Sequence, residues 1–289
     1  MTGTSHAQRS TDEGYDCVVV GGGVAGLSAA MVLGRARRRT LLLDRGGQSN
    51  RPASHVGGLL GHDGTPPSEL YELARRQLSA YPAIETKDGM AAAAGIEFDQ
   101  FVITLSGGGE VRTRALVLAT GMDYEVPDVP GFAELWGGAV FHCPFCHGWD
   151  VRDRRVAVYG PSEIAVRLAT LLTAWTDDVF TVDPGDISRA RLDDGALQAL
   201  VRHDGDELAC DAVLVHAPLR ARGRLAQDLG LALTEDGLIA VDHEMHTSVP
   251  GVYAAGDVAV APQQVAVAMG SGHTAGLVAV RELMLGRPL

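Results

Sequence analysis

The chain has 289 residues, 46% of them hydrophobic, and 36 Asp and Glu against 24 Lys and Arg give a formal net charge of -12. This length is sufficient for two ordinary domains with buried cores, and the acidic balance argues against a nucleic-acid-binding surface. No apolar stretch reaches the roughly 18 residues that a membrane span requires, so we predict a cytoplasmic protein that binds neither nucleic acid nor membrane.

The N-terminal segment, residues 1–14, is polar and lacks the apolar region of a secretory signal. We predict that it is a flexible tail. Ordered structure is expected from Tyr15, where the sequence "YDCVVVGGGVAGLSAA" begins with a short apolar run typical of a strand.

The glycine motif after this run predicts a strand–helix–strand unit that binds a dinucleotide. Gly21 permits a tight turn, Gly23 lets the backbone approach a pyrophosphate, and Gly26 lets the helix pack closely on the strand. A second apolar run ends at Asp44, 23 residues after Gly21. A carboxylate at this place binds ribose hydroxyls. A further apolar run, residues 115–122, breaks at Thr120 and Gly121, which predicts a strand that ends beside the same ligand.

The next motif is "HCPFCHGWD", which holds two cysteines separated by two residues and a histidine on each side, namely His142, Cys143, Cys146 and His147. A C-x-x-C occurs in zinc sites, in structural staples and in redox pairs. Zinc needs two further ligands in tetrahedral geometry, and Cys17 and Cys210 lie far away in apolar strands. A close cysteine pair in a reducing cytosol is more often catalytic or metal-binding than structural. We therefore favour a redox pair and predict no metal.

A second strand–helix–strand pattern follows, with strands expected at residues 156–159 and 179–182 and a helix from about Glu163. The turn between them begins with Gly160 but has Ser162 where a nucleotide-binding turn has its middle glycine. A side chain therefore stands where the backbone must approach a pyrophosphate. Glu163 adds a negative charge in the first helical turn, which opposes bound phosphates.

The C-terminal part contains "GVYAAGDVA", residues 251–259, an apolar strand that ends in Gly-Asp at Asp257. A long helical pattern covers residues 262–283. We expect this helix to begin close to Gln264 and Val265.

Taken in this order, the motifs resemble the flavoprotein disulfide reductases with two dinucleotide-binding domains. The resemblance implies an α/β fold of two Rossmann-like (three-layer ββα) domains, the second inserted in the first. Residues 15–122 and 243–289 would form the FAD-binding domain, and residues 123–242 the NAD(P)H-like domain that carries the C-x-x-C. FAD is the implied cofactor. Asp257 would bond its ribityl chain, and Gln264 and Val265 would offer a helix N-terminus to the pyrimidine edge of the isoalloxazine.

Within that family the chain resembles the low-molecular-weight thioredoxin reductases, with two departures. The residue after the second cysteine is an aspartate in those reductases and His147 here. Their basic segment for the 2′-phosphate of NADPH is replaced by "VDPGDISR", in which Asp183 and Asp186 would repel that phosphate. We therefore expect a degenerate nicotinamide site, although a residual NADH site stays open because Asp183 lies 23 residues after Gly160.

The C-x-x-C-H motif looks like that of the flavin-dependent dithiol oxidases that close disulfides in natural products of the gliotoxin, holomycin and depsipeptide type. The resemblance implies a homodimer, a small dithiol as substrate, and dioxygen reduced to hydrogen peroxide. Cys143 would exchange with the substrate, and Cys146 would be the thiol nearer the flavin. His147 would relay protons, with His142 and His273 as further candidates.

The substrate pocket is expected between the C-x-x-C and the loop of residues 51–67, which is rich in glycine and proline. Two alternatives stay open. A disulfide reductase for thioredoxin or a similar protein would run the same chemistry in reverse with NADH or another donor. A non-catalytic FAD-binding partner could use the C-x-x-C to report redox state.

Overall fold

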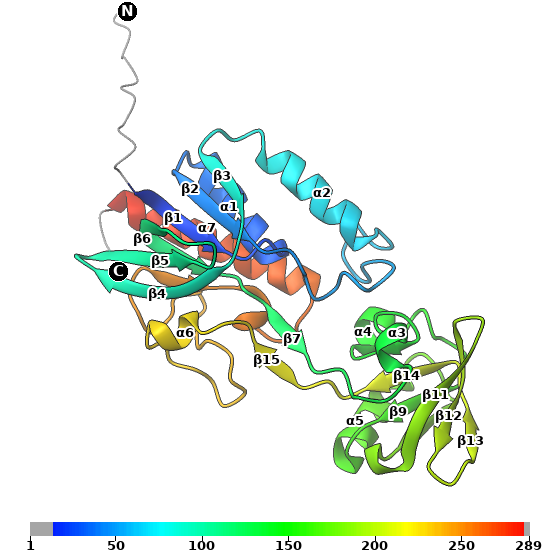
Figure 1. Ribbon diagram of the computed structural model, residues 1–289. Helices are drawn as coiled ribbons and strands as arrows, with labels where there is room; N and C mark the ends of the chain where they lie inside the picture. Colours follow the sequence, from blue (N-terminus) through cyan, green and yellow to red (C-terminus); the bar gives the residue numbers. More distant parts are fainter. Residues whose placement is uncertain (1–13, 286–289) are drawn as a thin grey trace, which may run out of the picture. The chain divides into compact units, whose positions relative to one another are not determined.

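The computed structural model describes residues 14–285 of the chain, so all of the predicted tail except Gly14 lies outside the described residues. The described residues form two α/β units (Figure 1). The first unit takes in the described parts of Met1–Gly46, Ala74–Gly121 and Ala221–Leu289, and the second takes in Gly47–Leu73 and Met122–Arg220. The predicted insertion of one α/β domain into another is confirmed.

The first unit is built on parallel strands that run side by side in the order β3, β2, β1, β6, with β16 pairing on the far side of β6. Their bounds are β1 Tyr15–Val20, β2 Thr40–Asp44, β3 Ile84–Asp88, β6 Glu110–Leu118 and β16 Val252–Ala254. The carboxyl-terminal halves of β1 and β6 and the whole of β2 and β16 are buried. Their sequences are accordingly continuous apolar runs, as expected of strands covered on both faces.

Two antiparallel strands extend this sheet. β4 (Ala91–Glu97) and β5 (Gln100–Leu105) pair with each other, and β5 pairs with the first half of β6. The second half of β6 pairs with β16 instead. A single long strand therefore joins the parallel and the antiparallel parts of the sheet.

Helices α1 (Val24–Arg35) and α7 (Val265–Leu285) pack against each other closely because small residues line their contact. A Cβ at Gly272 would overlap the carbonyl of Ala25, and a Cβ at Gly276 would lie 2.8 Å from the carbonyl oxygen of Ala29. A third helix, α2 (Pro67–Leu78), has residues in both units. The bare glycine backbone is thus what permits the α1–α7 distance.

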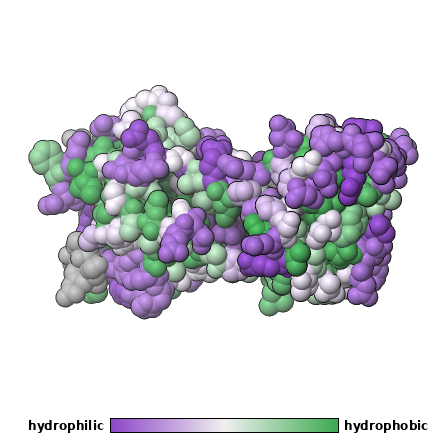
Figure 2. Space-filling model, turned by 90° about the horizontal axis from the view of Figure 1, so that it is seen from below, coloured by the Kyte–Doolittle hydropathy of each residue, from purple (hydrophilic) through white to green (hydrophobic). Residues whose placement is uncertain are grey.

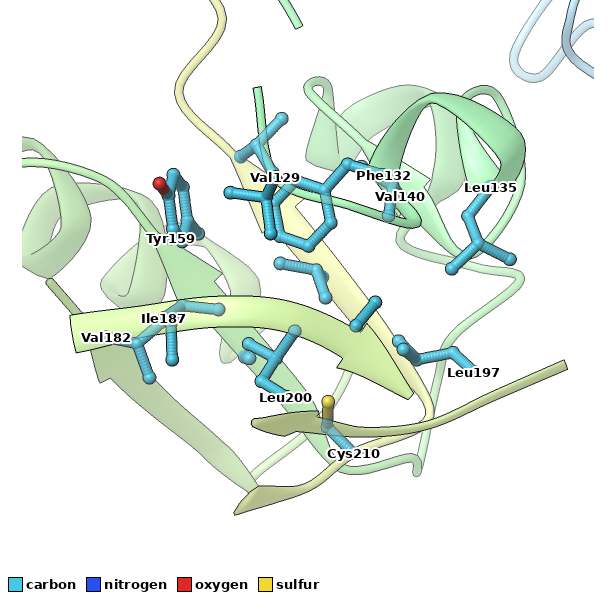
Figure 3. Packing of buried hydrophobic residues seen from close by; sticks show 14 residues of the cluster. Val129, Phe132, Leu135, Val140, Tyr159, Val182, Ile187, Leu197, Leu200 and Cys210 are labelled. Atoms are coloured by element: carbon cyan, nitrogen blue, oxygen red, sulfur yellow. The ribbon is translucent and has the colours of Figure 1, made fainter. Parts of the chain in front are cut away.

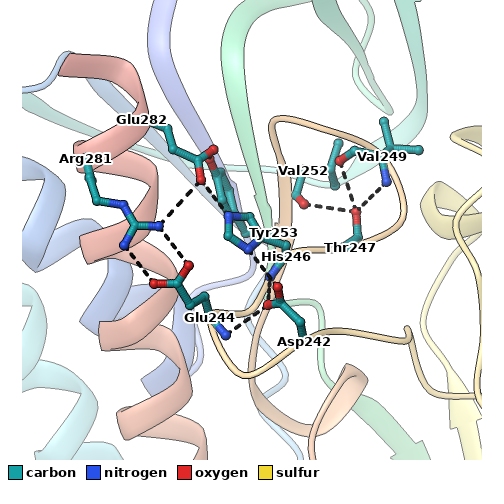
Figure 4. Close-up of polar contacts among 9 residues, drawn as sticks. All are labelled: Asp242, Glu244, His246, Thr247, Val249, Val252, Tyr253, Arg281 and Glu282. Atoms are coloured by element: carbon teal, nitrogen blue, oxygen red, sulfur yellow. Dashed lines mark hydrogen bonds and ion pairs between the residues drawn. The ribbon is translucent and has the colours of Figure 1, made fainter. Parts of the chain in front are cut away.

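The C-terminal turns of α7 are tied to the rest of the first unit through the buried carboxylate of Glu282 (Figure 4). It accepts hydrogen bonds from the Tyr253 hydroxyl and from His246 Nε2, the latter at 2.5 Å. The other ring nitrogen of His246 lies 3.0 Å from Asp242 Oδ2. Burial alone would lower the pKa of His246, but hydrogen bonds to Glu282 and Asp242 raise it overall.

The second unit contains a parallel sheet in the order β10, β9, β14, β8 and an antiparallel sheet in the order β11, β12, β13. The first has β8 Val140–Phe141, β9 Val156–Tyr159, β10 Val179–Val182 and β14 Ala212–Val215. The second has β11 Ile187–Asp193, β12 Ala196–Arg202 and β13 Glu207–Ala209. The helical segments are α3 Phe132–Leu135, α4 Pro144–His147, α5 Ser162–Leu172 and the 3-10 turn η1 Pro184–Asp186.

The core of the second unit lies between its two sheets (Figure 3). Leu200 from β12 and Val213 from β14 are fully buried there, and the ring of Phe132 meets Tyr159 edge-on with centroids 5.3 Å apart. Helix α5 covers the opposite face of the parallel sheet, with Ala165 and other apolar side chains against β9 and β14. The strands predicted at residues 156–159 and 179–182 are confirmed as β9 and β10.

The boundaries of the two units differ from those predicted. Residues 221–242 were expected in the second domain, but Ala221–Leu289 belongs to the first unit. The reason is hydrogen bonding: Asp228, at the end of α6 (Leu225–Asp228), accepts from the Ala94 backbone N–H at 3.3 Å, and the Ile239 N–H donates to the Val258 carbonyl. Residues 47–73 were expected in the FAD-binding domain, but Gly47–Leu73 belongs to the second unit. The chain passes between units at β7 (Met122–Tyr124) and β15 (Leu219–Ala221), which pair with each other.

Figure 2 shows one face of the molecule, on which hydrophilic side chains are spread widely and hydrophobic ones lie in small groups between them. Among residues 14–285, no helix is both long enough and apolar enough to cross a membrane.

The packing of α1 on α7 gives a stability prediction with an internal control. We expect Gly272→Ala to lower the free energy of unfolding by about 1–3 kcal/mol, because the added methyl group must displace the backbone of α1. Gly270 lies in the same helix, is exposed and has open space around it, so Gly270→Ala should raise that free energy by up to about 1 kcal/mol. Chemical denaturation of both variants makes the comparison, and equal effects would contradict this account of the helix contact.

Candidate active site

Three parallel strands of the first unit end side by side, and each is followed by predicted cofactor residues. Val20 of β1 is in register with Leu118 of β6, and Leu118 is in register with Ala254 of β16. The residues that follow these ends include Gly21, Thr120 and Asp257. Ligands of open parallel sheets bind outside the carboxyl ends of their strands. The fold therefore brings together three motifs that lie far apart in the sequence.

The glycine turn has the conformation that the motif predicts. Gly21 has φ +116°, and a Cβ there would overlap the carbonyl of Ala119. Gly26 lies within α1, where a Cβ would overlap the Gly21 carbonyl. Gly23, the N-cap of α1, has no protein atom within 4 Å of an ideal Cβ. Contacts within the chain thus explain the first and third glycines, whereas the second faces open space, as expected where a pyrophosphate lies.

Asp44 is buried at the end of β2 and is held in place by two donors. Arg75 of α2 donates to its Oδ2 at 2.5 Å, and the Gly46 backbone N–H donates to its Oδ1 at 2.8 Å. A carboxylate offers about four acceptor positions, so Asp44 can accept from several donors at once. No motif in the sequence marks Arg75, because its partner Asp44 lies 31 residues away.

Asp257 lies in the 3-10 turn η2 (Gly256–Val258) that follows β16. Burial raises the pKa of its carboxyl group, and the nearby charge of Arg222 acts in the opposite direction. Arg222 Nη1 also lies 3.7 Å from an ideal Cβ on Gly121, whose φ is +69°. Arg222 thus places a positive charge beside two predicted cofactor residues, and no motif in the sequence had marked it.

Helix α7 begins at Val265, with Gln264 directly before it, at the place where the resemblance implied a helix N-terminus. With Gly23 facing open space and Asp257 only partly buried, the residues present in the first unit fit a dinucleotide such as FAD. The glycine turn and α1 would hold its pyrophosphate, Asp44 its ribose, and Asp257 its ribityl hydroxyls.

The cysteine pair lies in the second unit, at the short helix α4 that follows β8. Cys143 is the N-cap of α4, and Cys146 lies on its only turn. Their sulfur atoms are 2.6 Å apart, so the two thiols can exchange a disulfide with little movement. Among the described residues no group of three or more His, Cys, Asp or Glu side chains is placed to hold a metal ion.

His147 ends α4, and its ring stacks on Phe141 with centroids 5.4 Å apart. Burial lowers the pKa of His147; the charge of Asp150 and backbone hydrogen bonds to Gly137 and Cys143 oppose this, and the charge of His55 adds to it. Its Nδ1 is buried and has no hydrogen-bond partner among the described residues. The side chain is therefore a neutral imidazole near pH 7, because burial lowers a pKa whose ordinary value already lies below 7.

His142 occupies a different environment from His147. Its ring contacts the rings of both Tyr124 and Trp136, with centroid distances of 3.9 and 5.4 Å. Burial, with a smaller effect of His147, lowers the pKa of His142 to about 4. His142 is thus a packed aromatic neighbour of the pair and a weak base. The third candidate histidine, His273, is exposed on α7 in the first unit.

The loop of residues 51–67 lies against the cysteine motif. A Cβ at Gly57 would overlap the carbonyl of Cys146, and a Cβ at Gly137 would lie 2.6–2.8 Å from the backbone of Pro52 and Ala53. A cavity of about 540 Å³ in this unit is lined in part by Pro52, Gly137 and Trp136. The sequence predicted that this loop lies near the C-x-x-C, but it did not predict that the loop belongs to the second unit.

The second unit also contains the turn where a nicotinamide cofactor would bind. Ser162 begins α5 and is exposed together with Glu163. At the end of β10 the Asp183 carboxylate accepts from the Gly185 N–H at 3.0 Å, and Asp186 lies 3.7 Å from Arg202. The acidic residues at this strand end therefore have local structural partners.

Three comparisons with known proteins agree with this architecture. A family model described as pyridine nucleotide-disulphide oxidoreductase matches residues 15–195 and 186–272. Thioredoxin reductase tcpT of Claviceps purpurea is 32% identical, over 95% of this chain and 96% of its own length. Thioredoxin reductase sirT of Leptosphaeria maculans is 31% identical, over 91% of this chain and 92% of its own.

Two solved structures have the same fold. In the crystal structure of HlmI, the chain is 35% identical in sequence to this one and has a TM-score of 0.89; the match covers 96% of this chain and 95% of that chain. In the crystal structure of an oxidoreductase from Agrobacterium tumefaciens, the sequence identity is 33% and the TM-score 0.88; the match covers 95% of this chain and 100% of that chain.

The open space at Gly23 allows a test of FAD binding that is separate from folding. We expect the wild-type protein to be yellow and to release FAD on denaturation. Gly23→Val should keep the thermal stability of the FAD-free protein, because its side chain meets no protein atom, but should lose FAD by occupying the space of the pyrophosphate. Gly89→Ala, another glycine with open space around it, is the control and should stay yellow. Normal FAD content in Gly23→Val, by absorbance after gel filtration, would overturn this assignment.

Proposed function

This chain belongs to the pyridine nucleotide-disulphide oxidoreductase family, and from that premise we propose that it oxidises a small dithiol to a disulfide with dioxygen as the final electron acceptor. The protein is a flavin-dependent oxidoreductase, and the family implies FAD. The non-catalytic alternative is therefore set aside. The homodimer implied by the resemblance and the cytoplasmic location expected from the composition both stay predictions.

One observation carries the proposal: a buried neutral imidazole directly follows the second cysteine. The oxidation of a dithiol removes two thiol protons, so the enzyme needs a group that is unprotonated at neutral pH and can accept them. His147 meets this need, because its pKa is lowered by burial and its Nδ1 has no hydrogen-bond partner in the described part of the chain.

The proposed reaction begins with the Cys143–Cys146 disulfide. A substrate thiolate attacks the Cys143 sulfur, which forms a mixed disulfide and releases Cys146 as a thiolate. The second substrate thiol gives its proton to His147 and attacks the substrate sulfur of the mixed disulfide. The substrate leaves as a disulfide, and Cys143 and Cys146 are now both reduced. FAD, when bound, would accept these two electrons and pass them to dioxygen, which becomes hydrogen peroxide.

The nicotinamide site supports an oxidase over an NADPH-dependent reductase. Ser162 and Glu163 are exposed at the first turn of α5, where phosphates would need backbone N–H groups and positive charge. Asp183 and Asp186 stand at the strand end where a 2′-phosphate would need cations. NADPH is therefore not expected to supply electrons.

A reductase is the second candidate, because the curated relatives tcpT and sirT are both named thioredoxin reductases. In this reading a nicotinamide cofactor would supply the electrons, and the cysteine pair would reduce a disulfide in a partner. The two readings share the cysteine chemistry and differ in the direction of electron flow, so the electron donor and acceptor decide between them.

The oxidase reading predicts that a model dithiol and dioxygen are converted to disulfide and equimolar hydrogen peroxide. Cys143→Ser and Cys146→Ser should each abolish turnover, because disulfide exchange requires both sulfur atoms. Cys210→Ala is the control, since this cysteine is buried in the core of the second unit and burial raises its pKa to about 11; it should keep near wild-type turnover. Oxygen consumption and peroxide release measure the outcome, and full activity in either serine variant would refute the proposed relay.

The degenerate nicotinamide site predicts slow or absent reduction of bound FAD by NADPH under anaerobic conditions. The physical reason is repulsion of its phosphates by Glu163, Asp183 and Asp186. Stopped-flow absorbance of the flavin follows the reaction, with a chemical reductant such as dithionite as the control that the flavin can be reduced at all. Rapid bleaching at micromolar NADPH would restore the reductase reading.

A further inference from the structure

A histidine and an aspartate that the proposed reaction does not use lie beside the cysteine motif. His55 Nε2 is 3.2 Å from Asp150 Oδ2, and the Ser54 hydroxyl is 2.9 Å from His55 Nδ1. The side chains of His55 and Asp150 are 31% and 34% exposed. Both ring nitrogens of His55 therefore have partners, one of them a carboxylate three residues after His147.

The position of Asp150 is fixed by the turn that ends α4. Its backbone N–H donates to the His147 carbonyl at 2.9 Å, and the Gly148 N–H donates to the Pro144 carbonyl at 2.7 Å. These bonds hold the Asp150 carboxylate close enough for its charge to act on the His147 imidazole. The contact with His55 then connects this carboxylate to the loop of residues 51–67.

That loop is a well-formed structure with its own hydrogen bonds. The Val56 N–H donates to the Thr65 carbonyl at 2.8 Å, and the Gly58 N–H donates to Asp63 Oδ1 at 2.8 Å. Val56 is buried, and the adjacent Gly57 packs on the Cys146 carbonyl so closely that no side chain fits. His55 therefore comes from a segment whose backbone is already seated on the cysteine motif.

Several groups face the His147 imidazole from the elements packed against it. Asp150 is the acidic one, His55 and His142 are the titratable bases, and the backbone of Gly137 and Cys143 provides hydrogen bonds. The Asp150 charge favours a protonated imidazole, whereas a protonated His55 or His142 opposes it. Asp150 and His55 thus act on the same ring with opposite sign while paired with each other.

We propose that His55 and Asp150 are positioning residues for His147, which hold the loop on the cysteine motif and set the balance of charge beside the imidazole. This inference rests on the proposed function, in which His147 accepts a thiol proton. In that step the S–H bond breaks, the proton goes to a His147 ring nitrogen, and a thiolate and an imidazolium form. The Asp150 carboxylate stabilises the imidazolium, and the contact with His55 keeps that carboxylate in place.

The experiment is an NMR titration of the histidine rings in the purified protein, with the His147 signal assigned by its loss in His147→Gln. In Asp150→Asn the His147 pKa should fall further, by about 0.5 unit or more, because a charge that favours its protonated form is removed. In His55→Gln it should rise, because the interaction with His55 that opposes protonation of His147 is removed. Asp63→Asn changes a carboxylate of the same loop that bonds Gly58 and should leave the His147 pKa unchanged.

The opposite signs separate this proposal from a purely structural role. If the pair only held the loop in place, both variants would expose His147 to water and raise its pKa toward the ordinary value. A rise in Asp150→Asn, or no change in it, overturns the proposal.

A second readout is the acid limb of dithiol oxidation, which should move with the titration in the same direction for each variant. If no dithiol is oxidised by any form of the protein, the proposed function fails. The titration still decides whether Asp150 and His55 act on His147.

Discussion

The parallel pairing of β6 with both β1 and β16 is the constraint on which the cofactor site depends. It joins β6 to segments 98 residues before it and 136 residues after it, and aligns Val20, Leu118 and Ala254 at one edge of the sheet. Each of these strands is a buried apolar run, so a shift in register would leave backbone groups unsatisfied in the core. The glycine turn, the Thr120 segment and Asp257 acquire a common location only through this pairing.

The properties of the two histidines in the cysteine motif depend instead on how each ring is buried. Histidine is useful as a base near neutral pH only if its environment keeps it unprotonated. His147 and His142 flank the same cysteines. Within residues 14–285, Nδ1 of His147 has no hydrogen-bond partner, whereas the ring of His142 contacts those of Tyr124 and Trp136. The two histidines that the sequence treats alike are thus suited to different roles, proton transfer for His147 and packing for His142.

The acidic residues after β10 show that a dinucleotide-type unit can carry side chains unfavourable to a phosphate. β9, the turn at Gly160 and α5 keep the geometry of a dinucleotide-binding unit. Asp183 closes the following 3-10 turn by accepting from the Gly185 N–H. A side chain that opposes a phosphate can therefore still stabilise the local backbone, and so the fold alone does not establish that a cofactor binds.

The sequence by itself determined the two strand–helix–strand units, the strands at residues 156–159 and 179–182, the glycine turn and the cysteine pair, because each is encoded by local periodicity or by residues close in the chain. Only the tertiary structure decided that residues 47–73 join the second unit, that Arg75 holds Asp44, and that His55 meets Asp150. These are contacts between distant segments, whose partners are chosen by packing and hydrogen bonding across the fold and leave no periodic signal in the sequence.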